Sequence, residues 1–464
     1  MGRRKLLVIG LDSAPPELLF DKFRDELPNI RHLMEHGVYA RMRSCDPPIT
    51  VPAWMVMVTS RNPGSLGLYG FRHRKANSYT GDWIPDSQSV KQDRIWDILS
   101  RAGKKVCVVG VPPSYPPTPV NGEMISCLIT PDANRQYTYP AELKSEIEAL
   151  VGPYPFDVEF RTEERDVLLK NLCDMTERHF RVIEHLLTTR QWDFFMFVEI
   201  GLDRLHHAFW KYFDKDHPKY VAGNPYEGVT LDYYKRLDEH IGRLLKIVDE
   251  DTVVVVASDH GVRAMRGAFC VNEWLIREGY LVLKERPQNV IELEKASVDW
   301  GRTRAWAWGG YYARVFLNLI GREPQGIIER GEFERERDKL ATRLKEITDP
   351  SGRRMQTLVY RPTDLYPVAE GDKPDLIVYF DDLYWRSAGT VGHEELYLSE
   401  NDTGPDDAVH SHHGIFILND PHVRPMHEVS EVDILQVAPT LLERMEIPIP
   451  QSMEGEPLQL DARK

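Results

Sequence analysis

Acidic and histidine side chains follow several short apolar runs of this sequence. Four valines at 253–256 lead within three residues into Asp259 and His260. Similar residues stand beside three other apolar runs: Asp12 after 5–11, Asp203 and His207 after 194–200, and His410, His412 and His413 before 414–418. Carboxylates and imidazoles are ligands that suit zinc, manganese or iron. The pattern therefore predicts a site for divalent metal ions.

Each of these residues has a simpler interpretation when it is taken alone. An Asp at a strand end, such as Asp12, often caps the following helix. The pair Asp203 and His207 lies on one face of any helix, and the histidines at 410–413 also fit a solvated loop. Their joint placement favours the metal site, because the carboxyl ends of parallel strands meet at one edge of a sheet, where ligands bind.

Thr50 is the candidate nucleophile. It stands in PPITVPAW, residues 47–54, before a stretch suited to a helix, so we expect it to be an N-cap with Pro52 close to the first helical position. A hydroxyl at a helix N-terminus lies in a positive local field, which suits an anionic phosphoryl group. The capping and catalytic interpretations are compatible.

Composition narrows the classes of partner. The net charge of −14 over 464 residues disfavours a nucleic-acid polymer as partner, because no bulk positive field attracts it. A small anionic substrate is still compatible, since a bound cation reverses the local field. The five cysteines have no C-x-x-C spacing, so neither a disulfide framework nor a cysteine zinc site is expected.

No segment of the sequence reads as a leader or a membrane span. The apolar run of 5–11 stops at Asp12, which is too short for a secretory h-region. Uninterrupted apolar stretches stay well below the roughly 18 residues of a transmembrane helix. These features predict a soluble, cytoplasmic protein that does not act at a membrane. They indicate no oligomeric state.

Short apolar runs alternate with longer helical patterns. Runs that read as buried strands are 5–12, 105–111, 194–200, 252–259, 375–380 and 414–418. Residues 163–188 and 229–249 repeat apolar side chains at helical spacing. This alternation predicts an α/β fold with a mostly parallel sheet covered by helices on both faces.

The stretch from about 267 to 370 differs in composition and pattern from the rest of the chain. It is rich in Arg, Glu and Trp and has weaker strand signals. We interpret it as a smaller inserted subdomain. The catalytic, metal-binding core then consists of residues 1–266 and 371–464.

The ordered set of motifs resembles the alkaline phosphatase superfamily, and within it the type I phosphodiesterase/nucleotide pyrophosphatase family. The resemblance covers nearly the whole chain. It rests on five segments and the C-terminal stretch 431–458: VIGLDS, PPITVPAW, EIGLDRLHHAFW, ASDHG and DDAVHSHHGIFIL. It implies an alkaline-phosphatase-like three-layer sandwich.

The resemblance also implies two divalent metal ions, commonly zinc, at the carboxyl edge of the sheet. The implied ligands form two groups: Asp12, Asp259, His260 and the Thr50 oxygen for one ion, and Asp203, His207 and His410 for the other. The spacing in the family favours His410 over His412 and His207 over His206. Because adjacent residues diverge at a strand end, Asp259 and His260 are assigned to the metal pair more firmly than to either ion.

The implied reaction is cleavage of a phosphodiester or nucleotide pyrophosphate bond. Thr50 attacks the phosphorus atom, and water then hydrolyses the covalent phosphothreonine intermediate. The expected substrate is a small phosphorylated molecule such as a nucleotide.

Other reactions are known on the same scaffold. A sulfatase would need Cys or Ser in C/S-x-P-x-R, whereas residues 50–54 read TVPAW. A serine-triad hydrolase would need an elbow such as G-x-S-x-G, which is absent. A phosphomonoesterase, a phosphonate hydrolase or phosphotransferase, and a non-catalytic metal-stabilised binding protein stay open as alternatives.

Substrate-binding residues are not identified by the sequence. Nucleotide pyrophosphatases carry a phosphate-contacting Asn where this chain has GLYGFRHR, residues 67–74, so Arg72 or His73 is a candidate and a surface cluster is the alternative. The segment 299–312 has aromatic and arginine side chains suited to a base or a phosphate. Its tryptophans are more simply interpreted as core.

Overall fold

Continuous apolar runs form the centre of a large sheet in the computed structural model, which describes residues 4–460. Four parallel strands are buried along their whole length: β1 (Leu6–Leu11), β5 (Val106–Val109), β8 (Phe194–Glu199) and β9 (Val253–Ala257). Strands covered on both faces read as unbroken apolar runs, which explains why the sequence shows them clearly.

The sheet extends outward from these four strands in the order β20-β2-β19-β9-β1-β8-β5-β6-β7, and β21 also pairs with β2. The outer strands are β2 (Val38–Arg43), β6 (Gly122–Ile125), β7 (Thr138–Tyr139), β19 (His413–Asn419), β20 (His427–Glu428) and β21 (Val432–Asp433). Strand β19 runs antiparallel to β9. Its first residues therefore lie at the edge where the parallel strands end.

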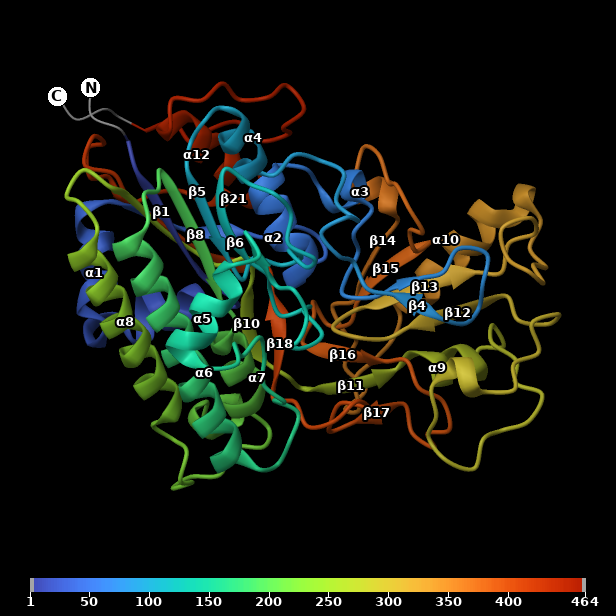
Figure 1. The fold of residues 1–464 in the computed structure, drawn as a ribbon. Coiled ribbons are helices and arrows are strands. Elements are labelled where there is room, and N and C mark those ends of the chain that lie inside the picture. Colours follow the sequence, from blue (N-terminus) through green and yellow to red (C-terminus); the bar gives the residue numbers. More distant parts are fainter. Residues whose placement is uncertain (1–3, 461–464) are drawn as a thin grey trace.

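Helices cover both faces of this sheet (Figure 1). Leu7 and Ile9 of β1 belong to the core under α1 (Pro28–His36), α6 (Arg165–Thr189), α7 (Gly201–Phe213) and α8 (Val229–Ile247). Leu6 and Val8 belong to the opposite core, with α2 (Thr50–Thr59), α4 (Ile95–Arg101) and α12 (Val437–Arg444). Alternate side chains of one strand thus serve two cores. The predicted three-layer α/β sandwich is confirmed.

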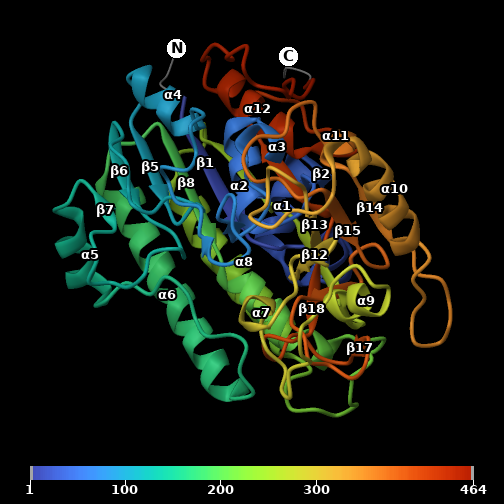
Figure 2. The same cartoon turned by 90° about the vertical axis from the view of Figure 1, so that its right-hand side faces the viewer.

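A second region has its own core and a separate antiparallel sheet, in the order β12 (Ala305–Trp308), β13 (Ala313–Leu317), β15 (Leu376–Tyr379), β14 (Leu358–Tyr360). It also contains α9 (Val271–Arg277), α10 (Phe333–Leu344) and the sheet β16 (Trp385–Ala388), β11 (Gly267–Cys270), β17 (Tyr397–Leu398). Figure 2 shows this region, yellow to orange, in front of the central sheet.

The strand predicted at 375–380 exists, but its assignment to the central sheet is wrong. It forms β15, which pairs with β13 and β14 of the second region. An apolar run gives no information about its partner strands. The division into a core and a subdomain at 267–370 stays a prediction, and residues 1–3 and 461–464 of that core lie outside the described residues.

Both predicted helices at 163–188 and 229–249 are present, as α6 and α8. Across residues 4–460, no helix combines the length and apolar character that a membrane crossing requires.

Close packing between β1 and α2 generates a first prediction. A Cβ at Gly10 would lie 2.7 Å from the ring of Trp54 and 2.7 Å from the carbonyl oxygen of Phe197. We expect Gly10→Ala to lower the free energy of unfolding by about 1–3 kcal/mol, because the core must shift to admit the methyl group. Urea denaturation measures this change.

The matched control is Gly331→Ala, since no atom lies within 4 Å of a Cβ built there. A wild-type urea midpoint for Gly10→Ala would contradict the packing of Trp54 against β1.

Candidate active site

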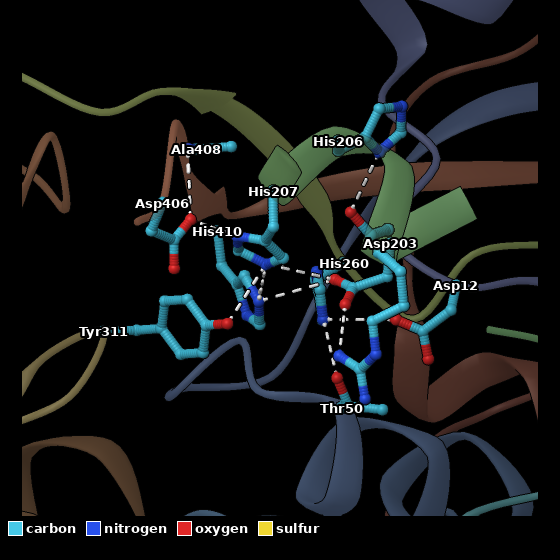
Figure 3. Close-up of polar contacts among 12 residues, drawn as sticks. Asp12, Thr50, Asp203, His206, His207, His260, Tyr311, Asp406, Ala408 and His410 are labelled. Atoms are coloured by element: carbon cyan, nitrogen blue, oxygen red, sulfur yellow. Dashed lines mark hydrogen bonds and ion pairs between the residues drawn. The ribbon is translucent and has the colours of Figure 1, made fainter. Parts of the chain in front are cut away.

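The predicted site residues meet at the carboxyl edge of the central sheet (Figure 3). Asp12 follows β1, and Asp259 and His260 follow β9. Asp203 and His207 lie one turn apart on α7, which begins two residues after β8 ends. His410 lies on β18 (Ala408–Ser411). This strand pairs with β10 (Gly261–Ala264), which begins at the residue after His260. All of these side chains are buried.

One group of donor atoms consists of Asp203, His207 and His410. The Nε2 atom of His207 lies 3.3 Å from Oδ1 of Asp203 and 3.3 Å from Nε2 of His410. The Nε2 atom of His410 lies 3.7 Å from the same carboxylate oxygen. Three donor atoms from two elements, α7 and β18, therefore converge on one point.

The second group consists of Asp12, Asp259, His260 and Thr50. The Nε2 atom of His260 lies 3.2 Å from Asp259 Oδ2, 3.7 Å from Asp12 Oδ1 and 3.2 Å from Thr50 Oγ1. The ring of His260 also stacks on that of His410, with centroids 3.8 Å apart. The two groups are thus neighbours, and His260 lies between them.

Thr50 is the first residue of α2, and Ile49 occupies the N-cap position. The prediction that Thr50 is the N-cap is therefore wrong, because the N-cap lies one residue earlier. Its hydroxyl faces His260 and does not cap the helix. Pro52 lies inside the first turn, where its missing N–H costs nothing.

Each of the three carboxylates is anchored through one oxygen. Asp12 Oδ2 accepts a hydrogen bond from the indole of Trp54 at 2.7 Å, and Asp203 Oδ2 accepts one from Arg204 at 2.8 Å. Asp259 Oδ1 accepts from the backbone N–H of Ser13. The other oxygen of each acid is buried and receives no hydrogen bond from residues 4–460. These three free oxygens belong to the two groups.

The three histidines are anchored in the same way, through Nδ1. His207 Nδ1 lies 2.8 Å from Asp406, His410 Nδ1 lies 2.8 Å from the carbonyl of Pro48, and His260 Nδ1 lies 3.0 Å from the carbonyl of Gly261. A carboxylate or carbonyl oxygen only accepts, so Nδ1 carries the proton. Each Nε2 then offers its lone pair to the groups, as in metal-ligating histidines with an oriented outer partner.

The electrostatics of the site are unfavourable without a cation. Burial, and then the charge of Asp203, raises the pKa of Asp12 well above its ordinary value. Burial, and then the charge of Asp12, does the same to the pKa of Asp259. Burial also acts to raise the pKa of Asp203, but His207 and Arg204 outweigh it and hold that pKa well below its ordinary value.

The donor set fits divalent metal ions. Four ligands at 2.0–2.1 Å around a tetrahedral zinc ion are separated from one another by roughly 3.3 Å. Six pairs of donor atoms within the two groups are separated by 3.2–3.7 Å. Mixed carboxylate and imidazole ligands suit zinc, manganese and iron.

A sequence model of the family described as type I phosphodiesterase/nucleotide pyrophosphatase matches residues 6–406. The chain belongs to this family. Its predicted class of activity, a phosphoric ester hydrolase, is therefore confirmed, and so is the predicted family.

Solved structures share the fold of this chain. The chain is 14% identical to an inactive variant of murine ectonucleotide pyrophosphatase/phosphodiesterase 5 in complex with AMP, with a TM-score of 0.57 and 96% of each chain covered. It is 13% identical to the human protein, again with a TM-score of 0.57 and 96% of each chain covered. No curated protein sequence matches the chain.

Two alternative histidines lie outside the groups. His206 contacts the hydroxyls of Ser13 and Tyr234, and burial lowers its pKa to about 3. His412 lies 3.2 Å from Asp382. His207 and His410, which the family spacing favours, lie in the first donor group, and their role as metal ligands stays a prediction.

The two candidates for the position of the family's Asn, His73 and Arg72, both have partners within the protein. His73 is buried, accepts a hydrogen bond from the backbone N–H of Tyr69 and stacks on Trp83. Arg72 forms an ion pair with Asp82 at 2.7 Å.

Tyr311 and Asp406 are site residues that the sequence did not single out. The hydroxyl of Tyr311 lies 3.1 Å from His207 Nε2, and its ring stacks on His410 with centroids 3.8 Å apart. Asp406 is fully buried and binds both His207 and Arg386. Tyr311 stands at the end of the aromatic segment 299–312, which gave a partial signal. In the same segment Trp306 is core and Trp308 is partly exposed.

A cavity of about 510 Å³ opens beside the groups. Tyr311, Arg161 and Arg386 line the part next to His207 and Asp406, and other lining residues come from the second region and from 69–72. A substrate in this cavity would reach both the donor groups and the second region.

Asp406 generates the second prediction. Asp406→Asn removes the charge that orients the His207 ring, so we expect Zn²⁺ to bind about 10–100-fold more weakly. Competition with a fluorescent zinc chelator measures the affinity.

The control is Asp382→Asn, which removes a carboxylate from a histidine outside the groups. Equal losses in the two variants would show that the Asp406 contact to His207 has no special role.

Proposed function

We propose that this family member cleaves phosphodiester or nucleotide pyrophosphate bonds through a covalent phosphothreonine on Thr50, with two divalent metal ions, most simply Zn²⁺. The observation that carries the proposal is the position of Thr50 Oγ1, 3.2 Å from His260 Nε2 in the second donor group. This hydroxyl is buried, and among residues 4–460 its hydrogen-bond contact is His260, which is itself a candidate metal ligand.

The ligands follow from the two groups. Asp203, His207 and His410 would hold one ion, and Asp12, Asp259, His260 and the Thr50 oxygen would hold the other. When bound, the ions supply positive charge that lowers the pKa of the Thr50 hydroxyl and neutralises the phosphoryl group. The anchored Nδ1 atoms and carboxylate oxygens keep the ligands fixed.

The chain's own residues then carry the substitution. Thr50 Oγ1 attacks phosphorus, the new O–P bond forms, and the bond to the leaving alcohol or phosphate breaks with its electrons. Water next attacks the phosphothreonine, releases the phosphoryl product and restores the hydroxyl. No side chain caps the first turn of α2. Its backbone N–H donors can therefore bind phosphoryl oxygens, as helix N-termini commonly do.

Tyr311 is placed to assist this step. If a metal ion binds Nε2 of His207, the hydroxyl of Tyr311 is free to donate a hydrogen bond to a phosphoryl oxygen. That contact would serve the role that the family assigns to an Asn.

The substrate proposed is a small phosphorylated molecule such as a nucleotide. The murine neighbour is described in complex with AMP. The cavity here offers Trp308, Phe71 and Tyr311 as aromatic side chains beside its arginines. The cytoplasmic location stays a prediction from the sequence.

The test compares bis-p-nitrophenyl phosphate with p-nitrophenyl phosphate as substrates. We expect protein stripped with a chelator to regain diesterase activity with Zn²⁺, and Thr50→Ala to lose at least about 1000-fold in kcat, because removal of a nucleophile abolishes the chemical step. Thr59→Ala, on the same helix and bonded to the carbonyl of Met55, is the matched control.

Faster cleavage of the monoester would contradict the diesterase assignment and indicate a phosphomonoesterase. Full activity in Thr50→Ala would contradict the nucleophile. Bound zinc without cleavage of either ester would contradict the proposed reaction on these substrates.

A further inference from the structure

Four arginines line the cavity beside the donor groups, and three of them form ion pairs with acids. Arg161 and Arg386 both pair with Asp406, at 3.3 and 2.6 Å. Arg72 pairs with Asp82 at 2.7 Å. The fourth, Arg314, forms no ion pair within 4.0 Å among residues 4–460.

Arg314 is fixed in place without an acid. It lies on β13 opposite Trp308 of β12, and its guanidinium lies 5.0 Å from the centroid of that indole ring. Among residues 4–460 its guanidinium makes one hydrogen bond, which one nitrogen donates to the backbone carbonyl of Arg72. A guanidinium has five N–H donors, so most of them are available to a ligand in the cavity.

The surroundings of Arg314 disfavour an isolated charge. The side chain is partly buried, and burial lowers the pKa of its guanidinium from the ordinary value. A desolvated cation is costly unless an anion or several acceptors compensate it.

Arg74 shows what a structural arginine looks like in the same region. Its guanidinium is buried and pairs with Glu323 at 2.6 Å and with Asp372 at 2.6 Å. It also lies over the ring of Phe316. Arg314 has no such acidic partner among residues 4–460. The contrast indicates that its partner is an anion from outside the chain.

We propose that Arg314 binds a second anionic group of the substrate, a carboxylate or a phosphate, on the part of the molecule beyond the phosphoryl group that is cleaved. This inference rests on the proposed function, because Arg314 and Tyr311 line the same cavity and the Tyr311 hydroxyl contacts His207 of the first donor group. A planar guanidinium binds either oxyanion through two parallel hydrogen bonds. The substrate class is then a phosphodiester or pyrophosphate with a distal negative charge.

The test measures binding to the metal-loaded, full-length Thr50→Ala protein, so that no turnover is needed. The probes are p-nitrophenyl phosphodiesters whose second alcohol is an alkyl chain of varied length, ending in a carboxylate, a phosphate or an uncharged methyl ester. Calorimetry gives the ratio of dissociation constants between the methyl ester and each anionic probe.

We expect an anionic probe to bind at least about 10-fold more tightly than the methyl ester at the best chain length, because charge-assisted hydrogen bonds are the strong ones. Arg314→Gln should bring the ratio close to one, and Arg314→Lys should keep part of it. The carboxylate and phosphate arms show which oxyanion is preferred. Arg335→Gln, an exposed arginine paired with Glu332, is the control and should keep the wild-type ratio.

A ratio near one for every probe in the parent protein would overturn the proposal. So would a ratio that Arg314→Gln leaves unchanged. If Arg314→Gln does not fold, Arg314→Lys provides the test. A wild-type ratio of dissociation constants in Arg314→Lys would exclude bidentate binding by Arg314. Turnover of the methyl ester by the wild-type protein is scored separately, and its failure would contradict the proposed reaction and not the anion site.

Discussion

Three buried carboxylates close to one another are the constraint on which this structure depends. Asp12, Asp203 and Asp259 are all withdrawn from water, and each has one oxygen without a hydrogen bond among residues 4–460. Negative charges so placed repel one another and are poorly solvated, which is costly unless cations compensate them. Divalent ions at the two donor groups would remove that cost, so the sites for metal and the stability of the fold are linked.

The rest of the architecture serves to hold these groups still. Fully buried strands place Asp12, Asp259 and His260 at one edge of the sheet. Helix α7, which follows the neighbouring strand β8, adds Asp203 and His207. Each ligand is then fixed by a second contact, such as Trp54 on Asp12 or Asp406 on His207. The second region closes over this edge with Tyr311, and so joins the chemistry to the cavity that would select the substrate.

Much of this arrangement could be predicted because it depends on local patterns. Apolar runs marked the strands, and the residues directly after them marked the site, because parallel strands end at one edge. Tyr311 and Asp406 could not be found in this way. They reach the site through pairing between distant segments, as β18 with β10 and β13 with β15, and an apolar run does not name its partner. The same reason explains why the strand at 375–380 was assigned to the wrong sheet.

The central claim is that the two donor groups hold two metal ions. The most direct test is the zinc content of the purified protein after loading and dialysis, measured by inductively coupled plasma mass spectrometry. We predict two ions per chain for the wild-type protein and one for Asp203→Asn, which removes a ligand of only the first group. One ion or none in the wild-type protein would contradict the account.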